Sequence, residues 1–109
     1  MEQNFSNVNR ISNGTKIIGN IEAQGDLRID GHVEGIITVT SKVVVGDTGY
    51  IKGDLTTDTL DMMGTLDGKI IAADTTSLKP TAKIDGSLKT GKLVVESGAK
   101  FNGTCIMGK

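Results

Sequence analysis

A short apolar–x–glycine–x–apolar pattern recurs along the whole chain and constrains its fold more than any other feature. Its glycines follow one another at nearly regular intervals, at Gly19, Gly35, Gly53, Gly68, Gly86 and Gly103. A second series of short apolar segments keeps step with the first and starts at positions 27, 43, 60, 76 and 93. Two series in phase over the whole chain predict one structural unit that is repeated about six times.

A period of roughly 17 residues predicts a β-solenoid, in which each repeat is one coil stacked on the previous coil. The β-branched residues Ile, Val and Thr make up 33 of the 109 residues, and they favour strands over helices. At roughly 3.3 Å per extended residue, one repeat traces a loop of about 55 Å, and stacked coils pair as parallel strands. Antiparallel hairpins would not require a constant period. The sequence therefore predicts an all-β parallel β-helix of about six coils.

The repeat also predicts which side chains face inward, because neighbouring residues of a strand point to opposite sides. The aliphatic residues that flank each glycine, such as Ile51 and Leu55, should form columns in the core. The position before each glycine is polar in five of the six coils, as expected of an outward face. We expect a flexible polar tail over residues 1–14, the β-helix over 15–107 and a short C-terminal end over 108–109.

The residues that carry chemistry are too few for an enzyme. The chain has one histidine, one cysteine, no P-loop sequence and a net charge of −1, with no basic footprint for nucleic acid. We interpret His32 as a polar residue in a bend and Cys105 as a small buried residue. We therefore expect no catalytic site, no metal and no cofactor. The absence of a spanning segment or signal core predicts a cytoplasmic location.

The two ends of the predicted solenoid are the candidate sites of interaction. A solenoid leaves strand edges open at its ends, and open edges pair with further strands unless they are capped. The last coil carries Phe101 where other coils have an aliphatic residue, with Cys105, Ile106 and Met107 beside it. The first coil offers Ile17 and Ile21. We expect these six residues to form a polymerisation interface; the alternative is that Phe101 closes the core of a monomer.

Two other functions are compatible with a β-solenoid. A monomeric module could bind a partner or a carbohydrate on a flat face, and Ile18, Ile36, Val44 and Val94 are the outward candidates for such a patch. A left-handed β-helix of the hexapeptide-repeat acyltransferases is the closest enzymatic alternative. Its strict hexapeptide period is absent here, and the interval between the glycines varies from coil to coil.

Three stretches of the sequence resemble the bactofilins, a family of bacterial polymer-forming cytoskeletal proteins. The first runs from Asn9 to Thr15 and is followed by Ile17–Ile21. The second is Gly25–Gly35, with the pattern leucine-x-isoleucine-aspartate-glycine-x-valine-x-glycine. The third is Val95–Gly103, which contains glycine-alanine-x-phenylalanine-x-glycine. The resemblance extends over roughly residues 9–107.

The resemblance implies a right-handed, three-sided β-helix that assembles end to end into non-polar filaments without nucleotide. It also implies that Phe101 takes part in the subunit contact. Filaments of the family act as scaffolds in cell shape and as platforms for cell-wall enzymes or other clients. Many members touch the inner face of the membrane through an apolar N-terminal stretch, and here only Met1 and Phe5 could serve that purpose.

Overall fold

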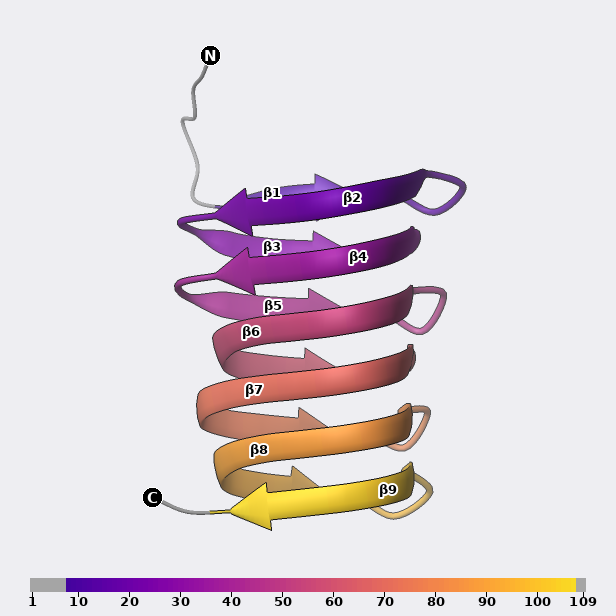
Figure 1. The fold of residues 1–109 in the computed structure, drawn as a ribbon. Helices are drawn as coiled ribbons and strands as arrows, with labels where there is room; N and C mark the ends of the chain where they lie inside the picture. The colour runs from indigo at the N-terminus through magenta and orange to yellow at the C-terminus, as the bar shows by residue number, and fades with distance from the viewer. Residues whose placement is uncertain (1–7, 108–109) are drawn as a thin grey trace.

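The computed structural model describes residues 8–107, and these residues form nine strands and no helix (Figure 1). No segment within that range is therefore a helix able to cross a membrane. The strands are β1 (Val8–Ile11), β2 (Lys16–Ala23), β3 (Asp26–Ile29), β4 (His32–Val39), β5 (Lys42–Val45), β6 (Tyr50–Met62), β7 (Thr65–Leu78), β8 (Lys83–Val95) and β9 (Lys100–Met107).

All the strand pairs are parallel, and each strand except β9 pairs with the segment one coil later. The chain descends from β1 to β9 in Figure 1, running leftward along the front and rightward along the back. The long strands β6, β7 and β8 pass round the corner between front and back without a break. The predicted parallel β-solenoid of about six turns is therefore confirmed.

The register of the pairs confirms the columns expected from the repeat. The six glycines of the pattern form a single ladder from the first coil to the last. Register shifts after Thr57 and after Ala72 absorb small differences in coil length. Two ladders of inward residues run beside the glycines, Ile17–Val33–Ile51–Leu66–Ile84–Phe101 and Ile21–Ile37–Leu55–Ile70–Leu88–Cys105.

The ladder glycines are required by the backbone. Gly53 and Gly68 have φ angles of +133° and +142°, a region that only glycine enters freely. A Cβ atom built on Gly68 would overlap the carbonyl oxygen of Gly53 in the preceding coil. Stacked coils approach so closely at this point that a side chain has no room.

Short turns join the back of one coil to the front of the next. Four of them share one geometry, in which a backbone N–H donates to the carbonyl three residues earlier, over residues 12–15, 46–49, 79–82 and 96–99. The links from Ile29 to His32 and from Met62 to Thr65 are two residues shorter than these turns, which accounts for the two shortest intervals along the sequence between glycines of the ladder, Gly19 to Gly35 and Gly53 to Gly68.

The N-terminal boundary of the solenoid differs from the prediction. Strand β1 lies within the stretch expected to be a flexible tail, yet its residues pair in register with β3, from Val8 opposite Asp26 to Ile11 opposite Ile29. Ile11 is buried in the core. The expected start at residue 15 is therefore wrong, because the polar residues Asn9 and Arg10 of this strand masked its place in the repeat.

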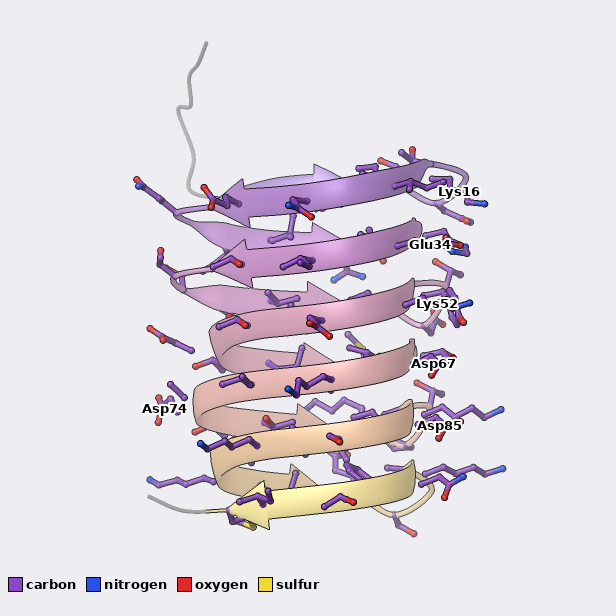
Figure 2. All side chains as sticks on the ribbon, viewed as in Figure 1. Lys16, Glu34, Lys52, Asp67, Asp74 and Asp85 are labelled. Atoms are coloured by element: carbon purple, nitrogen blue, oxygen red, sulfur yellow. The ribbon has the colours of Figure 1, made fainter. Side chains whose placement is uncertain are left out.

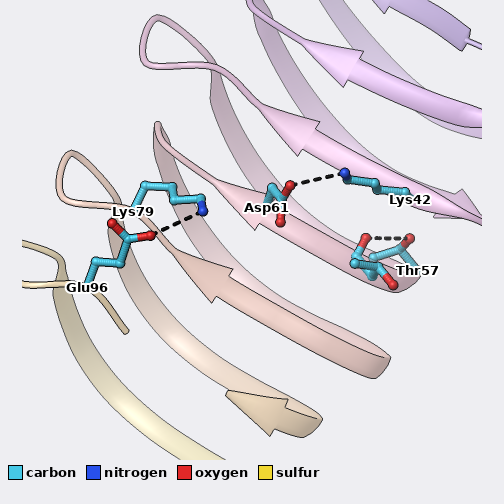
Figure 3. Close-up of polar contacts among 6 residues, drawn as sticks. Lys42, Thr57, Asp61, Lys79 and Glu96 are labelled. Carbon is cyan, nitrogen blue, oxygen red and sulfur yellow. Dashed lines mark hydrogen bonds and ion pairs between the residues drawn. The ribbon is translucent and has the colours of Figure 1, made fainter. Parts of the chain in front are cut away.

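Polar side chains inside the solenoid have partners. The Thr57 hydroxyl donates to the Ser41 carbonyl oxygen at 3.0 Å, and the Thr76 hydroxyl donates to that of Thr90 at 3.1 Å. On the outer surface, the ammonium of Lys42 pairs with the carboxylate of Asp61 at 3.2 Å across adjacent coils (Figure 3). Satisfied hydroxyls avoid the free-energy cost of burying a polar group alone.

Candidate assembly interfaces at the two ends of the solenoid

The C-terminal end of the solenoid exposes residues that would be core residues in any other coil. Strand β9 pairs with β8 on one side, and no strand within residues 8–107 pairs with its other side. Phe101 continues the column of Ile84 and is half-buried against the core. Cys105 continues the column of Leu88 but is exposed. The expectation that Cys105 is buried is wrong, because no coil of the described residues covers it.

The second half of β8 adds two apolar residues that the sequence analysis missed. Leu93 and Val95 follow Thr76 and Leu78 of β7, and no described strand covers them. Val95 is 54 % exposed although it lies in an inward column. The second apolar series already ends at these residues, and asking which coil would cover its last member would have identified both as interface residues. The C-terminal plate, as we call it, comprises Leu93, Val95, Phe101, Cys105 and Met107.

Ile106 was expected at the same interface, but it faces another way. It follows Lys89 and Ile71 in an outward column, so its exposed side chain lies on the flank of the solenoid. Met107 follows Thr90 in an inward column and is 53 % exposed. Met107 is therefore positioned for a contact at the end of the solenoid, whereas Ile106 lies on its flank.

The N-terminal end of the solenoid is a hollow rather than a plate. Ile17 and Ile21 of β2 are partly buried against the core, and no strand within the described range precedes β2 in its own column. An open cavity of about 450 Å³ lies at this end. The N-terminal hollow, as we call it, is lined by Arg10, Ile11, Ile17, Ile21, Glu22, Ala23, Gln24 and Leu27.

The remaining sequence candidates do not form a second site. Met1 and Phe5, the expected membrane contacts, lie outside the described residues. Val44 and Val94 occupy one outward column but are separated by Asp61 and Ser77. Ile18 of β2 and Ile36 of β4 lie in two other columns, opposite Glu34 and Asn20. The apolar patch expected of a monomeric binding module therefore does not assemble from these residues.

His32 and two of the acidic residues, Glu34 and Asp30, make contacts with neighbouring side chains. The His32 Nε2 atom lies 2.9 Å from a carboxylate oxygen of Glu34, and the Lys16 Nζ atom lies 3.9 Å from the same Glu34 oxygen. Lys16 and Glu34 both project at the right of Figure 2. The Asp30 carboxylate accepts a hydrogen bond from Arg28 at 3.0 Å and raises the pKa of its guanidinium. Within residues 8–107 no group of three His, Cys, Asp or Glu side chains could hold a metal ion.

Comparison with known proteins gives consistent results. The family model described as "Bactofilin: Polymer-forming cytoskeletal" matches residues 9–106. Bactofilin BacO of Myxococcus xanthus (strain DK1622) is 30% identical over 97 residues, which cover 89% of this chain and 77% of that protein. Bactofilin BacP of the same organism is 27% identical over 105 residues, 94% of this chain but only 44% of that protein.

A solved structure shares the fold. The chain resembles the cytoskeletal bactofilin BacA, whose atomic structure was revealed by solid-state NMR, with a TM-score of 0.86 and 28% sequence identity. The match covers 95% of this chain and 99% of the BacA chain. The agreement therefore extends over nearly the whole solenoid.

Proposed function

This chain belongs to the bactofilin family, and on that premise we propose that it is a structural protein that polymerises end to end through the C-terminal plate and the N-terminal hollow. The observation that carries the proposal is the exposure of inward-facing apolar residues at the last coil. Val95 and Met107 are each more than half exposed, whereas their equivalents Leu78 and Thr90 one coil earlier are buried. A second copy that covered these residues would extend the core.

The open strand edges support the same conclusion. Each coil in the interior has its backbone N–H and C=O groups paired on both sides, but the outer edge of β9 has no partner in the described chain. Unpaired edges next to exposed apolar residues favour the addition of another solenoid. At the other end, Ile17 and Ile21 are only partly buried. A second copy that covered the hollow would bury more of their apolar surface and so stabilise the joint.

We further propose that the filaments are non-polar, with like ends joined, and that assembly needs no nucleotide. The right-handed, three-sided form implied by the family belongs to this proposal, and the direction of winding in Figure 1 supports the right-handed sense. Cys105 provides a test of the polarity, because its side chain follows an inward column and so lies toward the solenoid axis. A two-fold axis at a C-terminal joint would bring two copies of Cys105 together.

The cysteine test uses the protein without substitution. A short bismaleimide crosslinker should convert polymers into covalent dimers and no larger species, since the chain has one cysteine. A head-to-tail polymer would place Cys105 against the N-terminal hollow, which has no cysteine, and would give no dimers. Absence of crosslinked dimers in samples that contain filaments would contradict the non-polar arrangement.

The cellular role that fits such a filament is a cytoplasmic scaffold rather than an enzyme. We propose that it supports cell shape or positions cell-wall enzymes or other clients. Contact with the inner membrane through Met1 and Phe5 stays part of the proposal.

Replacement of Phe101 by arginine tests the interface. A charge buried at the joint without a partner costs several kcal/mol, so Phe101→Arg should abolish filaments in negative-stain electron microscopy. Phe101→Leu, which restores the aliphatic residue of the other coils, is the matched control and should retain them. Because Phe101 also packs against the core, circular dichroism must show that Phe101→Arg keeps its strands.

A second variant covers the case in which Phe101→Arg fails to fold. Met107→Arg changes a residue that is 53 % exposed, so it should leave folding intact and still weaken the joint. Filaments that persist in a folded Phe101→Arg or in Met107→Arg would show that the C-terminal plate is not an interface. A sharp monomer peak for the wild type in size-exclusion chromatography at high concentration would favour the monomeric binding module instead.

A further inference from the structure

Charge is unevenly distributed along the solenoid although the net charge of the chain is −1. Residues 8–31 at the N-terminal end contain three basic and three acidic side chains. Residues 47–78 in the middle contain six aspartates and two lysines. Residues 83–107 at the C-terminal end contain four lysines and two acids. The two ends therefore differ in charge as well as in shape.

The four lysines at the C-terminal end have no ion-pair partner among the described residues. We call Lys83, Lys89, Lys92 and Lys100 the end lysines, and all four are exposed. Of the two acids nearby, Glu96 already pairs with Lys79 at 3.1 Å (Figure 3). The remaining acid is Asp85, which projects at the right of Figure 2.

The end lysines lie around the C-terminal plate. Lys83 and Lys100 are direct neighbours in one outward column, so two like charges stack on adjacent coils. Lys92 begins the uncovered second half of β8, and Lys100 begins β9, so both stand on open edges. A second copy that approached this end by a two-fold axis would bring its own end lysines toward these. The C-terminal joint would then combine apolar attraction with charge repulsion.

From this placement we infer that the C-terminal joint is gated by ionic strength, while the N-terminal joint between copies of this chain is not. The inference rests on the proposed end-to-end assembly. Exposed charges interact over about 30 Å at 0.01 M salt, but over less than about 10 Å above 0.1 M. At low salt the end lysines of two copies repel and only N-terminal joints form, which limits assembly to dimers. At higher salt the repulsion is screened and filaments form.

The first experiment follows assembly of the full chain with sodium chloride alone. At about 0.01 M salt, analytical ultracentrifugation should show dimers, and Cys105 should not crosslink. At about 0.5 M salt, filaments should appear in negative-stain microscopy, and Cys105 crosslinks should appear with them. Salt that weakened the filaments, or that left them unchanged over this range, would overturn the inference.

A pair of matched double variants separates charge at the end from a general effect of salt on apolar contacts. Lys92→Gln with Lys100→Gln removes two end lysines and should lower the protein concentration needed for filaments at low salt by about tenfold. Lys52→Gln with Lys69→Gln removes two exposed lysines of the middle coils, which also lack ion pairs among the described residues. This control should leave the protein concentration needed for filaments at low salt unchanged. At high salt the first variant and the wild type should assemble alike.

The outcomes distinguish the inference from the proposal beneath it. If both double variants change assembly equally, the position of the lysines is irrelevant and the gating is wrong, while end-to-end polymerisation stands. If the wild type and both variants stay monomeric at every salt concentration, polymerisation itself is wrong and the gating falls with it.

Discussion

The first and last front strands, β2 and β9, carry the same glycine pattern in the same register, yet their side chains have different surroundings. Ile17 and Ile21 of β2 are partly buried around a hollow, whereas Cys105 and Met107 of β9 are exposed. Strand β1 precedes β2 and stands across the core from it, but no described strand follows β9. The burial of an inward residue therefore depends on the coils that stack on it, and the sequence motif alone does not determine it.

The glycines show the same contrast between the ends. A Cβ atom on Gly103 would overlap the carbonyl of Gly86, as at every interior coil, because it points toward the preceding coil. A Cβ atom on Gly19 would meet open space, since no strand within residues 8–107 precedes β2 in its own column. The solenoid therefore has a direction that the repeat alone does not reveal, and its two ends respond differently to the same substitution.

The largest expected effect comes from breaking the glycine ladder. Gly68→Ala forces a methyl group onto the Gly53 carbonyl and should cost more than about 3 kcal/mol in the free energy of unfolding, enough to prevent folding. Gly19→Ala has the same unfavourable φ, +137°, without the overlap, and should cost about 1–2 kcal/mol. Urea denaturation followed by circular dichroism measures both at one protein concentration. Equal losses would mean that the backbone angle, and not the stacking, requires glycine.

A smaller difference is expected within a single inward column. Ile70→Ala removes a fully buried side chain and should cost about 2–5 kcal/mol, because the surrounding coils cannot close the cavity. In the unassembled protein, Ile21→Ala changes a partly buried residue at the rim of the N-terminal hollow and should cost about 1–2 kcal/mol. The same denaturation experiment compares them. If the two losses were equal, Ile21 would be covered in solution, as an N-terminal joint between copies predicts at high protein concentration.

The repeat in the sequence predicts the interior of the solenoid better than its two ends. The period of the glycines predicted the parallel coils and the inward columns, because identical spacing forces identical residues into register. Strand β1 was missed, although Asn9 and Ile11 precede Leu27 and Ile29 by the length of one coil and so continue the second series. Because Asn9 and Arg10 are polar, this stretch was not recognised as a member of the apolar series despite its spacing.

The properties of the ends were harder to predict. Cys105 is exposed because no coil within residues 8–107 covers it, and a local sequence pattern does not show whether a further coil follows. The net charge of −1 concealed the end lysines, because the aspartates that balance them lie in the middle coils. Only the register, which places residues 83–107 in the last coils, shows that the balance is not local.

The smallest expected effect joins stability to assembly at the C-terminal end. Lys79 and Glu96 connect two successive turns across an exposed surface, and such pairs contribute less than about 1 kcal/mol. Lys79→Gln should therefore lower the free energy of unfolding by no more than a few tenths of a kcal/mol. The same change leaves Glu96 unpaired near the end lysines and reduces the positive charge of that end. Assembly at low salt should rise slightly while stability falls slightly, which sedimentation and urea denaturation can detect separately. A fall in both would indicate that the turn geometry, and not the charge, governs the C-terminal joint.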